Sequence, residues 1–142
     1  VALHQDLSLP VRERRDAAGW SGWSEKDGVM FAQPPVTVLE RVLGVRLHLD
    51  PCDADDGALC VVPGSHRHGR LDPAAAAALR ERSGEEPCVA AAGDVLLLRP
   101  LLLHRSPKST SARPRRVLHF VFGPGTLPDG MAWPEPATVN DR

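Results

Sequence analysis

Apolar residues occur along the chain in short runs that are separated by glycine, proline and acidic residues. Short runs that are rich in leucine and β-branched residues and bounded by turn residues are typical of β-strands. We expect strands at Leu3–Leu9, Val45–Leu49 as the end of a longer segment, Ala58–Val62, Cys88–Ala91, Val95–Leu98, Leu101–His104 and Val117–Phe122. Seven short strands predict an all-β protein with the architecture of a double-sheet jelly roll.

Helix signals are concentrated in one segment, Asp72–Gly84. Asp72 suits the N-cap, Pro73 suits the first helical position, and Gly84 suits the end of the alanine-rich stretch between them. We therefore expect one short helix there. The segment Val36–Leu43 fits a helical turn nearly as well as a strand, so its type stays open.

The segments Pro10–Pro35 and Pro124–Pro136 lack a regular apolar pattern. The first is rich in charged and small residues and predicts a long loop, and a loop of that length in a compact domain usually has a function. Trp20 and Trp23 in this loop could cover a bound ligand as a lid, or could anchor the loop by packing. The second segment predicts an irregular tail. We assign Met30, Phe31, Leu118, Phe120 and Phe122 to core packing.

The composition is that of one globular domain. The 142 residues are 42% hydrophobic and 25% charged, which predicts a single domain over residues 1–142. A formal net charge of -1 gives no reason to expect nucleic acid or an anionic membrane as a partner. The sequence has no apolar run of about 18 residues and no signal-peptide pattern at its N-terminus, so we expect a cytoplasmic protein. Its cysteines, which form no CxxC pair, predict reduced and partly buried thiols.

Histidines are the best candidates for chemistry, because the sequence has no tyrosine, no Gly-x-Ser-x-Gly and no phosphate-binding glycine loop. His4 and Asp6 would lie on the same face of a strand, because side chains alternate along a strand. With a distant histidine they could form a triad of two histidines and one carboxylate, which leaves three positions on a metal open. His48 and Asp50 have the same spacing and are an open alternative. Their place before an acidic turn favours a solvated strand end.

A basic cluster, RPRR, precedes the strand expected at Val117–Phe122. Arg115 stands eleven residues after His104. A buried strand that begins with an arginine needs an anion, because an unpaired buried charge is costly. The carboxylate of a small ligand would supply that anion, since arginine binds carboxylates through two parallel hydrogen bonds. The alternative is that Arg113, Arg115 and Arg116 form a solvated basic cluster.

In combination, these motifs resemble the phytanoyl-CoA dioxygenase-like family of Fe(II)/2-oxoglutarate-dependent oxygenases. The family pattern has an HxD motif, a PGSH-like turn, a Gly-Asp pair before a leucine-rich strand, and a distal histidine followed by a serine and later by an arginine. The chain has these features in the same order at His4-Gln5-Asp6, Gly57-Ala58-Leu59 leading into PGSHRHG, Gly93-Asp94-Val95, His104-Arg105-Ser106 and Arg115-Arg116. The resemblance spans residues 2 to 123.

The resemblance implies a double-stranded β-helix of the cupin-like kind. It also implies that His4, Asp6 and His104 are the catalytic residues that bind Fe(II). Arg115 and Ser106 would bind the distal carboxylate of the cosubstrate 2-oxoglutarate. With O2, such an enzyme hydroxylates a small organic substrate and releases succinate and CO2. Related halogenases replace the acidic ligand with a small residue, so Asp6 favours hydroxylation.

The resemblance also separates the two HxD motifs, since the family segment that corresponds to His48-Leu49-Asp50 supplies no metal ligand. His66 and His68, which follow the PGS turn, are expected to be surface or turn residues. His119 alternates with Arg115 along its strand and should share its inward face. It would serve there either as a hydrogen-bonded core histidine or as support for the metal ligands.

Members of this family normally have a substantial N-terminal portion before the HxD motif, whereas here the first ligand is residue 4. We therefore expect the chain to lack part of the usual fold. It should either self-associate through an exposed sheet edge or turn over 2-oxoglutarate well below the rate of a version extended upstream. Two other functions stay open: a non-catalytic jelly-roll binding or structural protein, and a cupin-like metal enzyme that does not use 2-oxoglutarate. Arg115 distinguishes the three, because only the oxygenase needs it.

Overall fold

The computed structural model describes residues 2–136, whose paired strands are all antiparallel. The strands are β1 (Leu9–Val11), β2 (Ser21–Lys26), β3 (Val29–Gln33), β4 (Leu43–His48), β5 (Leu59–Val61), β6 (Glu86–Cys88), β7 (Val95–Leu98), β8 (His104–Arg105) and β9 (Val117–Phe122). The helices are α1 (Val36–Leu39) and α2 (Pro73–Ser83), with 3-10 turns η1 (Ala54–Asp56) and η2 (Ser65–His68). The strands form three sheets, in the orders β1-β3-β2, β7-β4-β9 and β6-β5-β8. The fold is an all-β jelly roll, as predicted.

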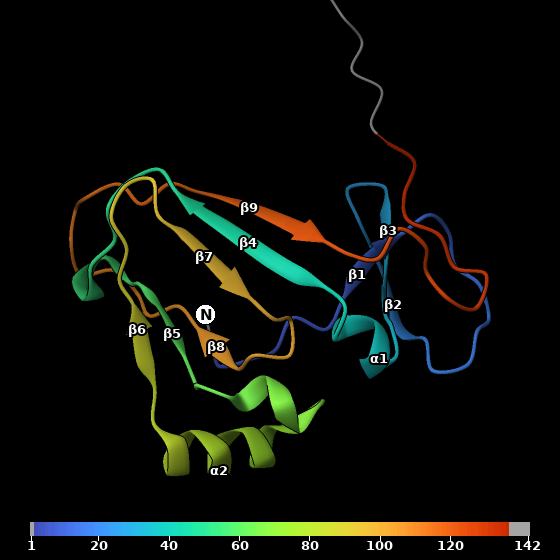
Figure 1. Ribbon diagram of the computed structural model, residues 1–142, viewed down its shortest axis with the longest axis horizontal. Helices are drawn as coiled ribbons and strands as arrows, with labels where there is room; N and C mark the ends of the chain where they lie inside the picture. The colour runs from blue at the N-terminus through green and yellow to red at the C-terminus, as the bar shows by residue number, and fades with distance from the viewer. Residues whose placement is uncertain (1, 137–142) are drawn as a thin grey trace, which may run out of the picture.

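The sheets β7-β4-β9 and β6-β5-β8 form the jelly roll itself (Figure 1). β4 is the central strand of the first sheet, and β9 pairs with it along its whole length. Alternation along β4 places Gly44, Arg46 and His48 on one face. Arg46 interacts electrostatically with Asp6 and with His104, which lies on β8 of the other sheet. This face of β4 therefore points into the interior between the two sheets.

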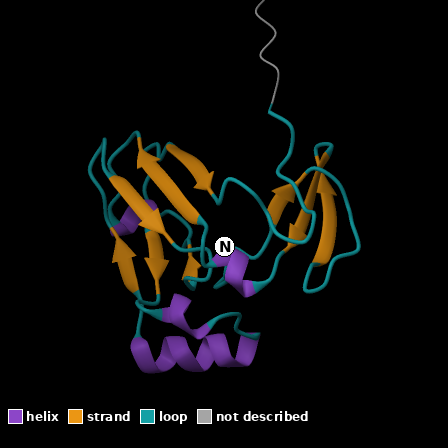
Figure 2. Cartoon of the chain, turned by 45° about the vertical axis from the view of Figure 1, so that its right-hand side comes forward, coloured by secondary structure: helices purple, strands orange, loops and turns teal. Residues whose placement is uncertain are grey.

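The segment that was predicted to be a long loop contains the third sheet, so that prediction was wrong. Figure 2 shows this β1-β3-β2 sheet standing apart from the jelly-roll sheets. β2 and β3 are joined by Asp27-Gly28, in which both residues have positive φ (50° and 76°), as in the type I′ turn of β-hairpins. β2 carries mostly exposed polar residues, with only Trp23 half-buried. The hairpin was missed because β2 lacks the apolar alternation by which a strand is recognised.

Trp20 and Trp23 serve in packing. Trp20 is 7% exposed and belongs to the main apolar cluster, which joins β1, β3 and α1. Its Nε1 donates to Oδ2 of Asp129 at 3.2 Å. Trp23 packs against the same cluster, and the guanidinium carbon of Arg14 lies 5.6 Å from its ring centroid. Of the two roles left open by the sequence, the structure shows the packing role.

The most regular segments were predicted best. Val95–Leu98 and Val117–Phe122 coincide with β7 and β9, and Ala58–Val62 contains β5. The predicted helix is α2, and the carboxylate of its N-cap Asp72 accepts a hydrogen bond from the amide of Ala75 at 2.8 Å. These are the segments in which local pattern and tertiary environment agree.

Other predicted strand boundaries were wrong. Leu3–Leu9 pairs through a single bridge between His4 and His104 before β1 begins. Cys88–Ala91 and Leu101–His104 each share only one residue with β6 and β8. The bounds of such short strands are set by partner strands, which the local sequence does not encode.

One face of the β7-β4-β9 sheet is apolar and exposed. Its most exposed side chains, between 44% and 59% accessible, are Val95, Leu97, Leu118, Phe120 and Phe122. The assignment of the three β9 residues to the core was therefore wrong, because no described segment covers this face. Met30 and Phe31 are half-buried, and Met30 packs against the main apolar cluster.

The open segment Val36–Leu43 contains the single-turn helix α1 and ends at the first residue of β4. The described cysteines, Cys52, Cys60 and Cys88, are free thiols, as predicted. Among the described residues, no helix has the length and apolar content that crossing a membrane requires.

Candidate metal centre and anion site

The structure brings His4, Asp6 and His104 together from distant parts of the chain. One potential ligand atom of each residue lies within 4.8 Å of those of the other two. Nε2 of His4 is 3.6 Å from Oδ1 of Asp6, and Nε2 of His104 is 3.6 Å from Oδ2. The two imidazole centroids are 4.3 Å apart. We call these three residues the metal-ligand cluster.

Backbone contacts orient both imidazoles. The amide of each histidine donates to the carbonyl of the other at 3.0 Å, which forms an antiparallel bridge. Nδ1 of His4 lies 2.7 Å from the carbonyl oxygen of Ala2, and Nδ1 of His104 lies 2.8 Å from that of Leu102. A carbonyl can only accept, so we assign the proton to Nδ1 in both rings, which leaves the Nε2 lone pairs directed toward Asp6. Burial lowers the pKa of His104 and so favours its neutral, metal-binding form.

The dimensions of the metal-ligand cluster fit a divalent transition metal. Neighbouring ligands that lie about 2.1 Å from a metal are about 3 Å from each other. The 3.6 Å separations would therefore close by only a fraction of an ångström on binding. Two neutral imidazoles with one carboxylate form the donor set of facial Fe(II) sites, which keep three positions open. The Asp6 side chain is 52% exposed whereas that of His104 is 9% exposed, so the Asp6 side of the cluster is the accessible one.

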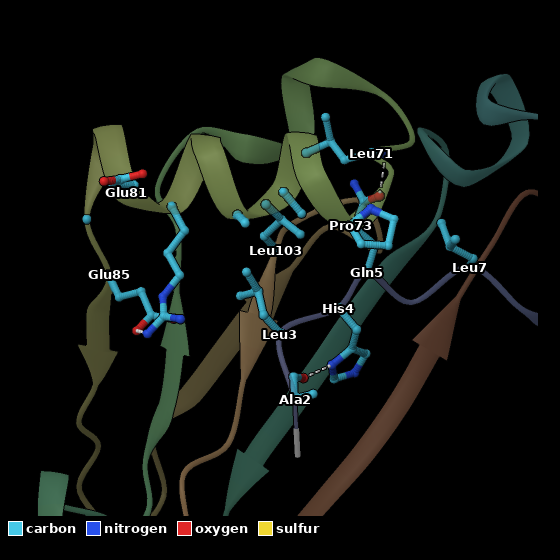
Figure 3. A pocket seen from close by; sticks show the side chains of 14 residues that line it. Ala2, Leu3, His4, Gln5, Leu7, Leu71, Pro73, Glu81, Glu85 and Leu103 are labelled. Atoms are coloured by element: carbon cyan, nitrogen blue, oxygen red, sulfur yellow. Dashed lines mark hydrogen bonds and ion pairs between the residues drawn. The ribbon is translucent and has the colours of Figure 1, made fainter.

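Gln5, between the two ligands of the HxD motif, was not singled out by the sequence. Its Nε2 donates to the carbonyls of Gly69 and Leu101 at 2.8 and 2.7 Å, and its Oε1 accepts from the amide of Leu71 at 2.9 Å. Figure 3 shows the bond between Gln5 and Leu71 beside α2. These bonds attach the N-terminal segment where it has no continuous strand pairing. Gln5 is therefore a positioning residue for His4 and Asp6.

Two arginines of the RPRR cluster are paired with carboxylates. Arg113 lies 2.8 Å from Oδ2 of the buried Asp56 and 2.9 Å from Oδ2 of Asp53. Arg116 donates to both carboxylate oxygens of Asp50, at 2.8 and 2.9 Å. These hydrogen bonds lower the pKa of Asp50 to about 2. The three arginines are exposed, as expected for a solvated basic cluster, but Arg113 and Arg116 are also paired with carboxylates.

Arg115 has no carboxylate partner among the described residues. Its Nη1 donates to the carbonyl of Gly57 at 2.6 Å and to Oγ of Ser106 at 3.2 Å. Ser106 in turn donates to the same Gly57 carbonyl at 3.0 Å. The expectation of a buried arginine was wrong, since Arg115 is exposed and precedes β9. It is held by neutral acceptors and keeps its charge available to an anion.

The alternative HxD motif does not form a comparable cluster. Asp50 is occupied by Arg116, as described above. His48 is 4% exposed, so the expected solvated strand end was wrong for this residue. Burial, followed by the nearby Arg46 and Arg115, lowers the pKa of His48 and favours a neutral ring.

Arg46 is the candidate that the sequence analysis missed. It lies on β4 opposite His119 and on the same face as His48. Nε of Arg46 and both ring nitrogens of His48 are buried and have no hydrogen-bond partner within residues 2–136. The sequence does contain a sign of this site, because Arg46 and His48 are two polar residues that alternate with leucine in an otherwise apolar strand. Unpartnered polar groups inside a protein require an explanation.

Two cavities border the metal-ligand cluster. One, of about 460 Å³, lies against Asp6, Lys26, Phe31 and His119. His119 thus faces inward, as predicted, but it is exposed and is not a core residue. The other, of about 830 Å³, lies between the N-terminal segment and α2 and includes His4 (Figure 3). The remaining histidines, His66 and His68, belong to the turn η2, as predicted.

The chain is similar to a known protein family in sequence and to solved proteins in structure. The sequence matches the family model for phytanoyl-CoA dioxygenase (PhyH) over residues 2–117. EctD from S. alaskensis, solved with 2-oxoglutarate and 5-hydroxyectoine, is similar with a TM-score of 0.54 and 30% identity, over 59% of this chain and 31% of EctD. A search of curated proteins finds no match to the chain.

Two further solved structures share the fold. HygX from Streptomyces hygroscopicus, solved with nickel, 2-oxoglutarate and hygromycin B, has a TM-score of 0.54 and 22% identity, over 89% of this chain and 51% of HygX. AviO1 from Streptomyces viridochromogenes Tue57 has a TM-score of 0.54 and 22% identity, over 85% of this chain and 53% of AviO1. The chain therefore spans 31% of EctD and roughly half of the other two proteins.

We expect His4→Ala and His104→Ala each to remove most of the affinity for a divalent metal. Each deletes a ligand, so the loss should exceed the roughly 10- to 100-fold that removal of an outer partner costs. Calorimetric titration with Ni(II), or with Fe(II) under anaerobic conditions, measures this. His48→Ala is the matched control and should bind nearly as well as the wild type. Loss of binding in His48→Ala with retention in His4→Ala would place the metal at the other motif.

We expect Gln5→Leu to destabilise the protein by about 1 to 3 kcal/mol, because it leaves the Leu71 amide and two carbonyls without a partner. Metal affinity should fall as well, since the segment that carries two ligands is attached through Gln5. Urea unfolding and Ni(II) calorimetry report the two effects. Gln33→Leu, on β3, is the control, since no described contact uses its amide as a hydrogen-bonding group. Equal results for the two variants would remove the positioning role from Gln5.

Proposed function

Since the chain belongs to the phytanoyl-CoA dioxygenase family, we propose that it is an Fe(II)/2-oxoglutarate-dependent oxygenase that hydroxylates a small organic substrate. One observation carries the proposal: a cluster of two imidazoles and a carboxylate lies in the same jelly roll as Arg115, which has no carboxylate partner among the described residues. EctD and HygX, which share the fold, both have 2-oxoglutarate in their structures.

His4, Asp6 and His104 would hold Fe(II), for which their donor atoms and spacing are suited. With 2-oxoglutarate and O2, the bound metal supplies an oxidation that inserts oxygen into a C–H bond of the substrate and releases succinate and CO2. The two histidines contribute neutral Nε2 ligands, because backbone carbonyls hold their Nδ1 protons. Asp6 contributes the negative charge that partly neutralises the metal.

Arg115 and Ser106 would bind the distal carboxylate of 2-oxoglutarate. Arg115 is directed by the Gly57 carbonyl and by Ser106, and its remaining donors are available to a ligand. Arg113 and Arg116 cannot take this role without releasing Asp56 and Asp50. Of the three arginines in the RPRR cluster, Arg115 is therefore the one whose charge is available to a dicarboxylate.

We place the organic substrate in the cavity of about 460 Å³ beside Asp6. Its volume lies within the range of small-molecule sites, about 300 to 1,000 Å³. Lys26 and His119 supply polar contacts, and Phe31 supplies an apolar wall. Asp6 belongs to this lining, so a molecule bound there would lie next to the metal. A cytoplasmic location and the absence of a nucleic-acid partner stay predictions of the sequence.

We expect Arg115→Ala to weaken 2-oxoglutarate binding by about 1.5 to 3 kcal/mol, the range for a hydrogen bond to a charged group. Anaerobic titration of the Fe(II)-loaded chain, followed by the weak charge-transfer absorption of the keto-acid chelate, measures the affinity. Arg113→Ala is the matched control and should change it little, because Arg113 is already paired. Similar losses in both variants would show that only a diffuse basic patch acts.

The same titration of the wild type tests the function as a whole. Metal binding without any 2-oxoglutarate chelate would indicate a cupin-like metal protein, and absence of metal binding would indicate a non-catalytic jelly roll. Either result would overturn the proposal. Succinate release in the presence of O2 would support it, with His104→Ala as the inactive control.

We also propose that the described chain self-associates through the β9 edge and the exposed apolar face of its sheet. An exposed apolar sheet face beside an open edge favours a second copy. Light scattering coupled to size exclusion should show a mass that rises with concentration. Phe120→Glu should keep the chain monomeric, because it places a charge in the middle of the face. Val29→Glu, on β3 of the separate β1-β3-β2 sheet, is the control, and a monomer at every concentration would contradict the prediction.

A further inference from the structure

We propose that Arg46 is a second anion anchor of the cosubstrate site, where it binds the carboxylate next to the keto group of 2-oxoglutarate. The inference rests on the proposed function and deepens it. It assigns a binding role to a residue of β4, whereas Arg115 precedes β9 and would hold the opposite end of the ligand.

The position of Arg46 is compatible with this role. Strand register places it on the inner face of β4, opposite His119 on one side and Leu96 on the other. Its guanidinium interacts electrostatically with Asp6 and His104 of the metal-ligand cluster. It also interacts with Arg115. Arg46 is therefore within electrostatic reach of both ends of the proposed cosubstrate site.

Arg46 has no structural partner that would explain its place inside the jelly roll. No hydrogen bond or ion pair to its side chain occurs among the described residues, and its buried Nε is unpartnered. Among the described residues, Asp6 is the one carboxylate whose charge acts on Arg46, and it belongs to the metal-ligand cluster.

The half-buried guanidinium of Arg46 and the exposed guanidinium of Arg115 repel each other, and an anion bound near both would relieve this repulsion. Burial and the nearby Arg115 lower the pKa of Arg46, and Asp6 acts in the opposite direction. A dicarboxylate neutralises both arginines at once, because its two charges are at opposite ends. We assign Arg46 to the carboxylate next to the keto group because Arg46 interacts with Asp6 and His104 of the metal-ligand cluster. Arg115 contacts Gly57 and Ser106 instead, so it is assigned to the distal carboxylate.

His48 supports this assignment from the same face of β4. It is 4% exposed, and both of its ring nitrogens lack a hydrogen-bond partner. A neutral imidazole next to Arg46 can accept a hydrogen bond from the guanidinium without adding charge. Two adjacent unpartnered polar side chains indicate a site that is completed by a ligand.

The proposal predicts opposite effects on stability and on binding. An unpaired, partly buried arginine destabilises the ligand-free protein, so Arg46→Met should leave its melting temperature unchanged or higher. The same substitution removes a charged donor from the ligand, so affinity should fall. An arginine with a purely structural role would show a lower melting temperature and unchanged affinity.

The test uses the full chain loaded with Ni(II) and two probes, 2-oxoglutarate and 2-oxobutyrate, in calorimetric titrations. Both probes carry the keto group and its adjacent carboxylate, and only 2-oxoglutarate carries the distal carboxylate. Arg46→Met should weaken both by about 10- to 100-fold, the range for a hydrogen bond to a charged group. Arg115→Ala should weaken only 2-oxoglutarate. Arg46→Lys should fall between wild type and Arg46→Met, because it keeps the charge and loses the planar fork.

The controls separate failure of the inference from failure of the function. Arg41→Met changes an exposed arginine near the start of β4 and should bind both probes like the wild type. If the wild type binds neither probe, the proposed function fails and the inference fails with it. If the wild type binds both and Arg46→Met stays within about twofold of it, the inference alone is overturned. A loss confined to 2-oxoglutarate in Arg46→Met would place Arg46 at the distal end and would also overturn it.

Discussion

A buried carboxylate is stable only if a cation accompanies it, and this requirement fixes the partners of the arginines around β8 and β9. Asp56 is buried and pairs with Arg113, while Asp50 pairs with Arg116 and Glu85 with Arg105. These pairs join η1, the end of β4 and the start of β6 to the segments around β8 and β9. Because these carboxylates are paired, neither Arg46 nor Arg115 has a carboxylate partner within hydrogen-bond distance among the described residues. Under the proposed function, their charge is available to the anionic cosubstrate.

The metal-ligand cluster depends on a second constraint, which is the attachment of a short N-terminal segment. The His4–His104 bridge provides two backbone hydrogen bonds, and Gln5 provides three more to residues around η2, α2 and β8. Ser65 of the PGSH turn accepts from the amide of Leu103 at 2.8 Å and so holds the approach to β8. The position of the cluster therefore follows from side-chain contacts more than from continuous strand pairing.

The distribution of apolar surface differs from that of a closed sandwich. Apolar residues gather in two clusters, one around β1, β3 and α1 and one between α2 and the strands β5 and β8. The inner face of β4 is instead polar at Arg46 and His48, and its outer face is apolar but exposed. A jelly roll with a functional interior gives up core packing there, so its stability has to come from the clusters at its margins.

The sequence by itself determined the fold class, the strands β7 and β9, and the helix α2, because in these segments the local pattern agrees with the tertiary environment. It also named His4, Asp6, His104, Ser106 and Arg115 as candidate site residues, through motif order and the family resemblance. Tertiary structure alone decided the partners of the three RPRR arginines, the burial of His48 and the exposure of β9. It also decided the role of Gln5 and the unpaired state of Arg46. Pairing and burial depend on which distant segments meet, and neither can be read from neighbours along the chain.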